Sequence, residues 1–457
     1  MTELPPALPL EDEVLQLIRE GRLAELRASL ADYHPADIAD LLDEMPAEEA
    51  VVLFNLLNLE VASEVLDETG SLVRAELVEK VDDEKLADLL DELPMDDAVE
   101  FLEDLPDPTA ERLLGLMEPE EADDVRVLLA YEEETAGRLM NTDVITLRRN
   151  WSIRDALAFL AKVEEPETLH YLYVVDREQR LIGVVPIRNF ILALSNPERS
   201  VESIMTPEVV AVPVSADQEE LAEFISRYDF VAIPVVDERG RLVGVVTVDD
   251  ALDVLAEEAT EDIQRLGGSQ PLASPYFSVS VSEVVRKRII WLMFLFVASL
   301  LSSTVISTFE GMLGEVLVLM SFVPLITGTG GNAGSQTVTT IIRAIAVEEV
   351  RQNDVGRAWR REAAVGIVLG LLLGLVGAVV GLLTATFKGQ TALVGAVIGL
   401  TLPLVVVWAN TVATLVPIIA ERLDIDPTVI SAPMITTIVD ATALLIYFLI
   451  ARSVLGL

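Results

Sequence analysis

Five apolar runs in residues 286–457 constrain the fold of this chain more than any other feature. They lie near residues 287–307, 316–342, 363–387, 392–420 and 429–450. Each run is long enough to cross about 30 Å of hydrocarbon as a helix. Because a helix satisfies its own backbone hydrogen bonds inside a lipid bilayer, we expect five transmembrane helices.

The rest of the chain is strongly acidic. Residues 1–285 contain 21 Lys and Arg against 65 Asp and Glu, a net charge of −44, whereas residues 286–457 contain 11 and 10, a net charge of +1. This split predicts an acidic soluble part joined to a nearly uncharged membrane part. The acidity argues against nucleic acid as a partner, because its phosphates would be repelled. Charge alone favours a solvated surface over a cation-binding one.

Basic residues near the runs predict the orientation. Arg286, Lys287 and Arg288 precede the first run, and five arginines separate the second from the third, whereas the loop between the third and fourth carries only Lys388. By the positive-inside rule, the N-terminus lies in the cytosol and the C-terminus outside. The opening MTELPPALPLEDE lacks the pattern of a signal peptide, which agrees with this orientation.

Residues 1–135 are expected to form an acidic helical domain. ADLLDEMP (39–46), ADLLDELP (87–94) and VEFLEDLP (99–106) are variants of one unit, with apolar residues at helical spacing and a proline at the end. Repeated short helices of this kind predict a curved, superhelical stack. A plain helical spacer is the simpler interpretation, and nothing in this part looks catalytic.

Residues 136–260 contain an internal duplication. YVVDREQRLIGVV (173–185) returns as PVVDERGRLVGVV (234–246), and each copy predicts strand, helix, strand, turn, strand and helix. The pattern resembles a tandem pair of CBS domains, 136–200 and 201–260. This resemblance implies a regulatory module that binds adenosine nucleotides or ions. Residues 261–285 are then a connecting helix that leads to the membrane part at 286–457.

Asp440 is the acidic residue that lies deep inside an apolar run. A carboxylate at this depth costs at least a few kcal/mol unless it is paired or hydrated, and no Lys, Arg or His lies at comparable depth in the five runs. A permeating cation, water or a proton remains as its partner. The chain has no cysteine, and its two histidines lie outside the runs, so oxygen ligands for a hard ion such as Mg2+, Ca2+ or Mn2+ are favoured.

The second run contains PLITGTGGNAGSQTVTT (324–340), with four glycines beside Asn332 and Gln336. We expect the glycines to break the helix and to line a pore with freed carbonyls, although close helix packing through small residues also explains them. The fourth run carries Asn410 and Thr414, which line the pore or bond a neighbouring helix. In the fifth run, Pro433, Thr436 and Asp440 share one helical face.

Together these parts resemble the MgtE family of magnesium channels and transporters across nearly the whole chain. The resemblance implies a homodimer in the bacterial inner membrane that moves Mg2+ into the cytosol through a pore at the two-fold interface. It implies pore residues at Asp440, Asn332, Gly328, Thr436 and Ala432. Some family members carry Asn at the position of Ala432, and this difference puts the details of selectivity in question.

The resemblance also implies acidic residues that bind Mg2+ and close the pore when cytosolic Mg2+ is high. Carried over by position, they are Asp96, Glu100, Asp217, Glu219, Asp229, Asp250, Asp253, Glu258, Glu261 and Asp262. Clustered carboxylates repel one another, and a divalent ion bridges them. ATP is a second candidate ligand, at Thr247 and Asp250. The first CBS copy has Pro186 and Asn189 at the matching positions, which weakens the nucleotide expectation.

Three alternative functions make different demands on the sequence. A transporter of another divalent cation, such as Mn2+ or Co2+, shares the oxygen ligands and stays open. A non-transporting Mg2+ sensor or scaffold has no use for a costly carboxylate in the bilayer. An intramembrane metalloprotease needs histidine ligands in a span, which this sequence lacks, so we expect no enzyme activity.

Overall fold

The computed structural model describes residues 11–31, 33–163, 169–272, 276, 279–347, 349–423 and 425–456. The chain divides into two compact units, Met1–Glu258 and Ala259–Leu457. The division falls inside one helix, and the finer boundaries expected from the sequence stay a prediction. Parts of the expected 261–285 connecting segment, residues 273–275 and 277–278, lie outside the described residues.

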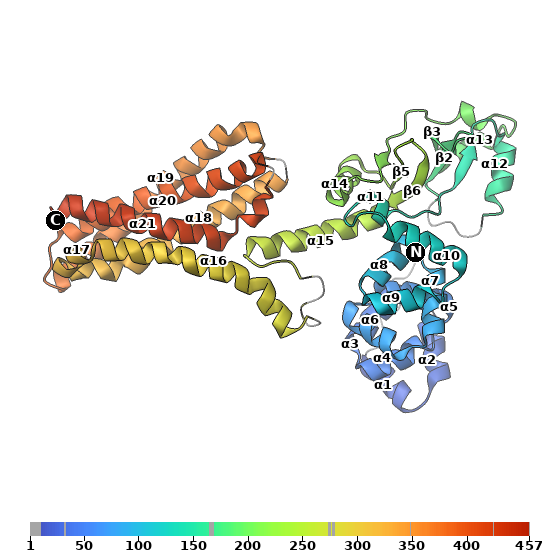
Figure 1. Cartoon of the computed structure of the whole chain (residues 1–457), viewed down its shortest axis with the longest axis horizontal. Helices are drawn as coiled ribbons and strands as arrows, with labels where there is room; N and C mark the ends of the chain where they lie inside the picture. The colour runs from blue at the N-terminus through green and yellow to red at the C-terminus, as the bar shows by residue number, and fades with distance from the viewer. Residues whose placement is uncertain are drawn as a thin grey trace, which may run out of the picture. The chain divides into compact units, whose positions relative to one another are not determined.

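The first unit begins with a stack of short helices (Figure 1). They are α1 (Glu11–Arg19), α2 (Leu23–Leu30), α3 (Pro35–Glu44), α4 (Ala47–Phe54), α5 (Leu59–Glu68), α6 (Ser71–Lys80), α7 (Asp83–Glu92), α8 (Met95–Glu103), α9 (Asp107–Leu114) and α10 (Pro119–Leu129). One carboxylate contact recurs in it. Asp43 accepts the backbone N–H of Gly70 at 3.1 Å, and Asp91 accepts that of Glu118 at 3.1 Å. Since both pairs are 27 residues apart, the repeat seen in the sequence is a structural repeat, and the helical superhelical domain is confirmed.

The CBS pair follows with two small sheets. The first copy has α11 (Ala136–Leu139), β1 (Thr146–Arg148), α12 (Ile153–Leu160), β2 (Tyr171–Val175), β3 (Leu181–Pro186) and α13 (Ile187–Ala193). The second has β4 (Val212–Pro213), α14 (Gln218–Tyr228), β5 (Ala232–Val236), β6 (Leu242–Thr247) and α15 (Val248–Leu266). In each sheet a parallel pair is followed by an antiparallel hairpin, in the order β1-β2-β3 and β4-β5-β6. The expected order of elements is confirmed in both copies.

The hairpin turns are built by the repeated aspartate. Asp176 Oδ1 accepts the N–H groups of Glu178 and Arg180, both at 2.9 Å. Asp237 Oδ1 accepts those of Arg239 and Arg241 at the same distance. A short polar side chain that bonds the backbone two residues on stabilises such a turn, so the sequence repeat and the turn have one cause.

The two CBS copies are interlocked through glycines. A Cβ on Gly183 in the first copy would lie 2.7 Å from Met205 Sδ, which precedes the second sheet. A Cβ on Gly244 in the second copy would lie 2.6 Å from Met140 Sδ, which precedes the first. Backbone bridges follow the same exchange, from Asn141 to Val245 and from Val184 to Thr206. Each copy therefore needs the other to complete its packing.

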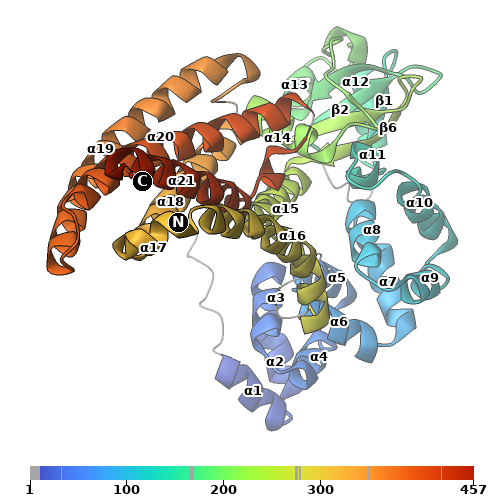
Figure 2. The same ribbon diagram turned by 60° about the vertical axis from the view of Figure 1, so that its left-hand side comes forward.

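Within its described residues, the second unit contains five helices that are long and apolar enough to cross a membrane, as the sequence predicts. Its elements are α16 (Val281–Thr308), α17 (Glu310–Glu315), a 3-10 helix (Leu317–Phe322) that runs into α18 (Val323–Ala346), α19 (Val355–Phe387), α20 (Leu393–Arg422), a 3-10 turn (Pro427–Val429) and α21 (Ala432–Leu455). Figures 1 and 2 show α19 lying along α20, while α18 and α21 form the neighbouring layer.

Glycines let α19 approach α20 closely. Buried glycines recur along α19 at Gly366, Gly370, Gly374, Gly377 and Gly381. A Cβ on Gly370 would lie 2.6 Å from the Cα of Pro403 on α20. A backbone atom cannot relieve such a clash by a change of rotamer. Small residues let membrane helices pack backbone to backbone in this way, because lipid gives no hydrophobic drive for association.

Replacing Gly370 by alanine should destabilise the membrane unit, since overpacking of this kind costs about 1–3 kcal/mol. Gly356→Ala on the same helix is the matched control, because the nearest atom to its added Cβ is a flexible Arg360 side-chain atom at 3.7 Å. Thermal unfolding of the full chain in detergent measures the difference. Equal midpoints for the two variants would contradict the close packing of α19 on α20.

Candidate functional site

Asp440 lies on α21 against the glycine-rich helix α18. A Cβ on Gly331 of α18 would be 3.5 Å from Asp440 Oδ1 and 2.8 Å from the Thr436 methyl carbon. One turn away, Ser335 Oγ lies 3.0 Å from Thr436 Oγ1. The structure therefore brings together two stretches that are about a hundred residues apart in sequence, the glycine-rich run and the Asp440 face.

Asp440 Oδ1 is buried and has no hydrogen-bond partner in the part of the chain that the structure describes. None of the ion pairs found there involves Asp440. A carboxylate within a membrane helix costs several kcal/mol if nothing compensates its charge. The site therefore offers a carboxyl oxygen, without a partner in the described residues, to a cation, a water molecule or a proton.

The expected break in the second span is absent, and this expectation was wrong. α18 is one continuous helix from Val323 to Ala346, so its carbonyls are engaged in the helix and are not freed for ion binding. The glycines pack instead. Cβ atoms on Gly330 and Gly334 would meet Val405 and Val439, and Ile435 and Val439, at 2.8–3.5 Å. The free energy of this close packing offsets the loss of conformational entropy that glycine brings to a helix.

The other side of α18 is open. A Cβ on Gly328 would have nothing within 4 Å, and Asn332 and Gln336, one and two turns later, are exposed in the single chain. Three positions at a spacing of four residues share a helical face. An exposed polar face on a membrane helix needs water or another polypeptide beside it.

Ala432 is the first residue of α21, and Ser431 caps the helix by accepting the N–H of Met434. The hydroxyl of the predicted pore residue Thr436 bonds its own helix, because its Oγ1 donates to the Ala432 carbonyl at 3.0 Å. The neighbouring Thr437 Oγ1 donates in the same way to the Pro433 carbonyl at 2.9 Å. The hydroxyl oxygens keep free lone pairs for a hydrated ion.

The polar face of the fourth span bonds a neighbouring helix. Asn410 on α20 is 2 % exposed, and its Nδ2 donates to the backbone carbonyl and to Oε2 of Glu362 on α19, at 3.2 and 3.3 Å. Thr337 Oγ1 of α18 lies 3.3 Å from the same Oε2. Glu362 is a residue that the sequence reasoning missed. It stands one position before the apolar run, whereas the helix itself begins at Val355.

A second group of acids lies in the first unit, where α15 of the second CBS copy meets the helical stack. Their mutual electrostatic influence joins Asp67 of α5, Glu100 of α8 and Asp104 to three acids of α15. We call this group the acidic face; its members are Asp67, Glu100, Asp104, Asp250, Asp253 and Glu257. The sequence analysis predicted Glu100, Asp250 and Asp253. It missed the other three, because each lies in a stretch rich in Asp and Glu that has the composition of an ordinary solvent-exposed helix.

The acidic face is short of positive charge. Burial, and then the Asp67 carboxylate, raise the pKa of Glu100 to about 7. Burial also raises the pKa of Asp67 to about 6, and Arg74 opposes that rise. Arg74 is the basic side chain that acts on Asp67 and Glu100 within the described residues, and its Nη1 lies 3.4 Å from Asp104 Oδ2. Burial likewise raises the pKa values of Asp253 and Glu257. The site therefore favours cations or protons.

Asp96, which the sequence analysis grouped with Glu100 as a Mg2+-binding acid, contacts different residues from Glu100. It is 7 % exposed, and its Oδ1 accepts a hydrogen bond from Asn141 Nδ2 at 3.1 Å. This bond, with the ion pair of Glu103 and Arg138 at 2.5 Å, joins the helical stack to the CBS pair. Asp96 thus helps to hold together the interface that carries the acidic face.

The remaining predicted regulatory acids are dispersed. Asp217 caps α14 by accepting the N–H groups of Glu219 and Glu220, and Asp229 ends the same helix in a left-handed conformation, with φ 53°. Glu258 accepts from Gln218 Nε2 at 3.3 Å. Glu261 and Asp262 belong to the second unit, where Glu261 pairs with Arg265. No group of three or more His, Asp or Glu arranged to hold a metal ion occurs among the described residues of this single chain.

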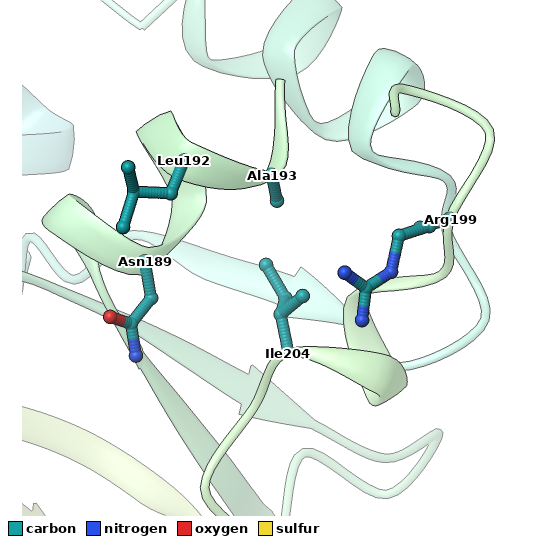
Figure 3. Close-up of a pocket in the computed structure, with 5 residues that line it drawn as sticks. All are labelled: Asn189, Leu192, Ala193, Arg199 and Ile204. Atoms are coloured by element: carbon teal, nitrogen blue, oxygen red, sulfur yellow. The ribbon is translucent and has the colours of Figure 1, made fainter. Parts of the chain in front are cut away.

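Thr247 and Asp250 bond each other. Asp250 Oδ2 accepts the Thr247 N–H at 3.0 Å and its hydroxyl at 2.5 Å. A separate pocket of about 240 Å³ lies where the first CBS copy runs into the second, lined by Asn189, Leu192, Ala193, Arg199 and Ile204. Figure 3 shows the Arg199 guanidinium and the Asn189 amide at its rim, with apolar side chains between them. The pocket thus combines one positive charge with an apolar wall.

Among the described residues, five membrane-length helices that carry a carboxylate without a hydrogen-bond partner, joined to a CBS pair, are the parts of a multi-pass membrane transport protein. Family models match "Divalent cation transporter" at residues 323–450, "MgtE intracellular N domain" at 33–134 and "CBS domain" at 136–196 and 201–257. The chain belongs to the MgtE family of magnesium transporters, and its recognition from sequence is confirmed.

Curated relatives extend over almost the entire chain. "Magnesium transporter MgtE" of Thermus thermophilus is 38% identical and covers 96% of this chain and 97% of its own length. The Bacillus subtilis protein of the same name is 32% identical, with 96% of each chain covered. A crystal structure of the cytosolic domain of the Mg2+ channel MgtE in complex with ATP covers 54% of this chain and 100% of its own, with 38% identity and a TM-score of 0.51.

The raised pKa of Glu100 predicts a pH dependence. The unfolded carboxyl titrates near 4.5 and the folded one near 7, so between these values the folded state holds a proton that the unfolded state has released. The free energy of unfolding therefore falls as pH rises through this window. Without divalent ions, Glu100→Gln should raise the unfolding midpoint of the full chain near pH 8, and the rise should become much smaller near pH 5, at the lower end of this window.

Circular dichroism of the detergent-solubilised protein measures this midpoint. Glu120→Gln, an exposed acid of α10, is the control for the loss of one negative charge. If both substitutions raise the unfolding midpoint equally near pH 8, the stabilisation comes from the lower total negative charge of the chain. The burial of Glu100 in the acidic face would then have no destabilising effect of its own.

Proposed function

We propose that this chain is a Mg2+-selective channel that admits Mg2+ to the cytosol and closes when Mg2+ binds its acidic cytosolic part. Membership of the magnesium transporter family supports Mg2+ transport. The direction of transport, the channel mode and the gating by Mg2+ are our inference from the site.

Asp440 is the observation that carries the proposal. Its buried, unpaired Oδ1 stands beside the close approach of α21 to α18 at Gly331. Oxygen ligands suit Mg2+, which keeps several of its waters when it binds proteins. The Thr436 hydroxyl and the Asn332 amide are suited to bond those waters, with Gly328 leaving space for them and Ala432 at the helix start.

A homodimer would complete the pore. The exposed polar face of α18, with Gly328, Asn332 and Gln336, is unsuited to lipid. A two-fold axis beside it would place the same face of a second chain opposite and would give two Asp440 carboxylates to one pathway. The loop charges support a bacterial inner-membrane topology with the N-terminus in the cytosol and the C-terminus outside.

Regulation would arise at the acidic face. Its carboxylates come from the helical stack and from α15, and burial penalises their charges. Mg2+ would bridge them and hold the helical stack on the CBS pair, whereas low Mg2+ would let repulsion loosen this interface. Asp217, Glu219, Asp229, Glu258, Glu261 and Asp262 stay predicted contributors.

Two further ligands stay open. ATP is supported by the relative solved in complex with ATP and by the pocket with Arg199, while Asp250 already bonds Thr247. Mn2+ or Co2+ would accept the same oxygen ligands, so ion competition belongs in any flux assay.

The pore assignment predicts that Asp440→Ala abolishes Mg2+ flux in proteoliposomes. Asp440→Asn keeps the shape without the charge, so it should lower flux by at least about tenfold. Asp354→Asn, in the turn before α19, is the control for loss of a carboxylate outside the spans. Unchanged flux in Asp440→Ala would refute the pore, and a parent protein without flux would favour a sensor or scaffold.

The sensor assignment predicts a loss of inhibition by internal Mg2+. A variant with Glu100→Gln, Asp253→Asn and Glu257→Gln should keep its flux at Mg2+ concentrations that silence the parent, because neutral amides have no need of a bridging ion. The matched control changes three exposed acids of α9 and α10: Glu111→Gln, Glu120→Gln and Asp124→Asn. Full inhibition of the first variant would show that the acidic face is no sensor.

A further inference from the structure

Glu362 brings three membrane helices together at one point. Its Oε2 accepts hydrogen bonds from Thr337 Oγ1 of α18 and from Asn410 Nδ2 of α20, both at 3.3 Å. The same Nδ2 also donates to the Glu362 backbone carbonyl at 3.2 Å. One residue of α19 therefore joins α18 to α20. We call the bonds among Thr337, Glu362 and Asn410 the three-helix contact.

Close packing encloses the three-helix contact on two sides. One turn after Glu362 on α19, a Cβ on Gly366 would lie 3.1 Å from the Val407 Cα and 3.4 Å from Asn410 Nδ2. Glycine thus lets the backbones of α19 and α20 approach closely enough for the amide to reach the carbonyl. In the opposite direction, one apolar residue of each helix joins a small buried cluster: Ile341, Ala358 and Ile418.

Glu362 also determines the orientation of the Asn410 amide. Nδ2 faces two acceptors, a carbonyl and a carboxyl oxygen, so a flipped amide would place oxygen against oxygen. Asn410 is buried, and its Oδ1 has no hydrogen-bond partner among the described residues. An unpaired buried amide oxygen costs free energy. The bonds that Nδ2 makes to Glu362 offset this cost in the folded chain.

The carboxyl groups of Glu362 and Asp440 have different surroundings. Asp440 Oδ1 has no hydrogen-bond partner in the described residues, whereas Glu362 Oε2 has two donors from neighbouring helices. Two donors fill the two lone pairs that a cation would need on that oxygen. None of the ion pairs found within the described residues involves Glu362. The geometry of Glu362 therefore fits a group that holds helices together.

The helix that Glu362 holds is the one that faces Asp440. Thr337 lies six residues after Gly331 and five after Asn332 on the continuous helix α18. A Cβ on Gly331 would lie 3.5 Å from Asp440 Oδ1, and Asn332 is exposed at the next position. Because a helix moves as a rod over so short a length, a shift at Thr337 also moves Gly331 and Asn332.

We infer that Glu362 is a positioning residue for the pore, because its carboxyl group fixes α18 against α19 and α20 and so keeps Asn332 in place beside Asp440. This inference rests on the proposed Mg2+ channel. Glu362 acts through Thr337 and Asn410 and does not itself bind the permeating ion. It therefore controls how well the pore recognises hydrated Mg2+.

The test compares Mg2+ flux in proteoliposomes for the full-length parent, Glu362→Ala and Glu362→Gln. Glu362→Ala should raise the Mg2+ concentration for half-maximal flux about three- to tenfold, the range expected when a hydrogen bond between membrane helices is lost. Glu362→Gln keeps a side-chain oxygen that accepts both bonds, so it should keep the parent concentration.

The half-saturating concentration separates positioning from folding. A variant that only folds less well lowers the maximal flux for the same amount of protein and leaves the half-saturating concentration unchanged. Competition by Co2+, which accepts the same oxygen ligands, should become stronger in Glu362→Ala, because Asn332 no longer faces the hydrated ion correctly.

Thr337→Val removes a donor of the three-helix contact and keeps Glu362 itself. It should shift the half-saturating concentration in the same direction as Glu362→Ala, and it carries the test alone if Glu362→Ala does not fold. Thr386→Val is the matched control, because the Thr386 hydroxyl donates to the Leu382 carbonyl of its own helix, α19. This control should keep the parent concentration.

A double-mutant cycle tests the contact without any flux. Thr337→Val and Glu362→Ala remove one shared hydrogen bond, so their effects on the unfolding midpoint of the detergent-solubilised chain should add to less than their sum. Fully additive effects would contradict the three-helix contact.

Two flux results would overturn the inference. The first is a parent half-saturating concentration in Glu362→Ala and Thr337→Val. The second is a Glu362→Gln variant that behaves like Glu362→Ala, since the charge of Glu362 would then act on the ion directly. A parent protein without Mg2+ flux would instead refute the proposed function, and the unfolding cycle would still decide whether the contact exists.

Discussion

The membrane unit depends on one contact, the approach of α21 to α18 where Asp440 stands beside Gly331. A side chain larger than hydrogen at Gly331 would collide with Thr436, so glycine is what lets a carboxylate come this close to a second helix. The neighbouring glycines, Gly330 and Gly334, fix the same two helices and α20 against one another. The free energy of helix packing keeps the Asp440 carboxyl group within the bilayer, where an ion pair with a basic side chain would otherwise be needed.

The same physical problem, negative charge without a partner, recurs in the cytosolic part with a different solution. In the acidic face the carboxylates stay close because hydrophobic burial of the helical stack against the CBS pair, together with the Asp96–Asn141 bond, holds their elements together. Burial then raises the pKa values of Asp67 and Glu100. Cations can control such an interface, because hydrophobic packing holds its elements together while repulsion between the carboxylates pushes them apart.

The sequence predicted some elements well because each had a local cause. The repeated aspartates at 176 and 237 make the same turn in both CBS copies, and the capping contacts of Asp43 and Asp91 repeat at the spacing of the repeated motif. The break in α18 was predicted wrongly, because glycine propensity is a local property while the packing that outweighs it comes from α20 and α21. Glu362 was missed because hydropathy marks the apolar run, and the helix extends beyond it.

By itself the sequence determined the five spans, the CBS duplication, the helical repeat and the isolated Asp440, because hydropathy, periodicity and charge are properties of short stretches of chain. Only the tertiary structure decided which residues meet: Gly331 with Asp440, Asn410 with Glu362, Asn141 with Asp96, and Arg265 with Asp426. These partners are up to 161 residues apart. Their contacts follow from how whole helices pack, and no local pattern encodes that packing.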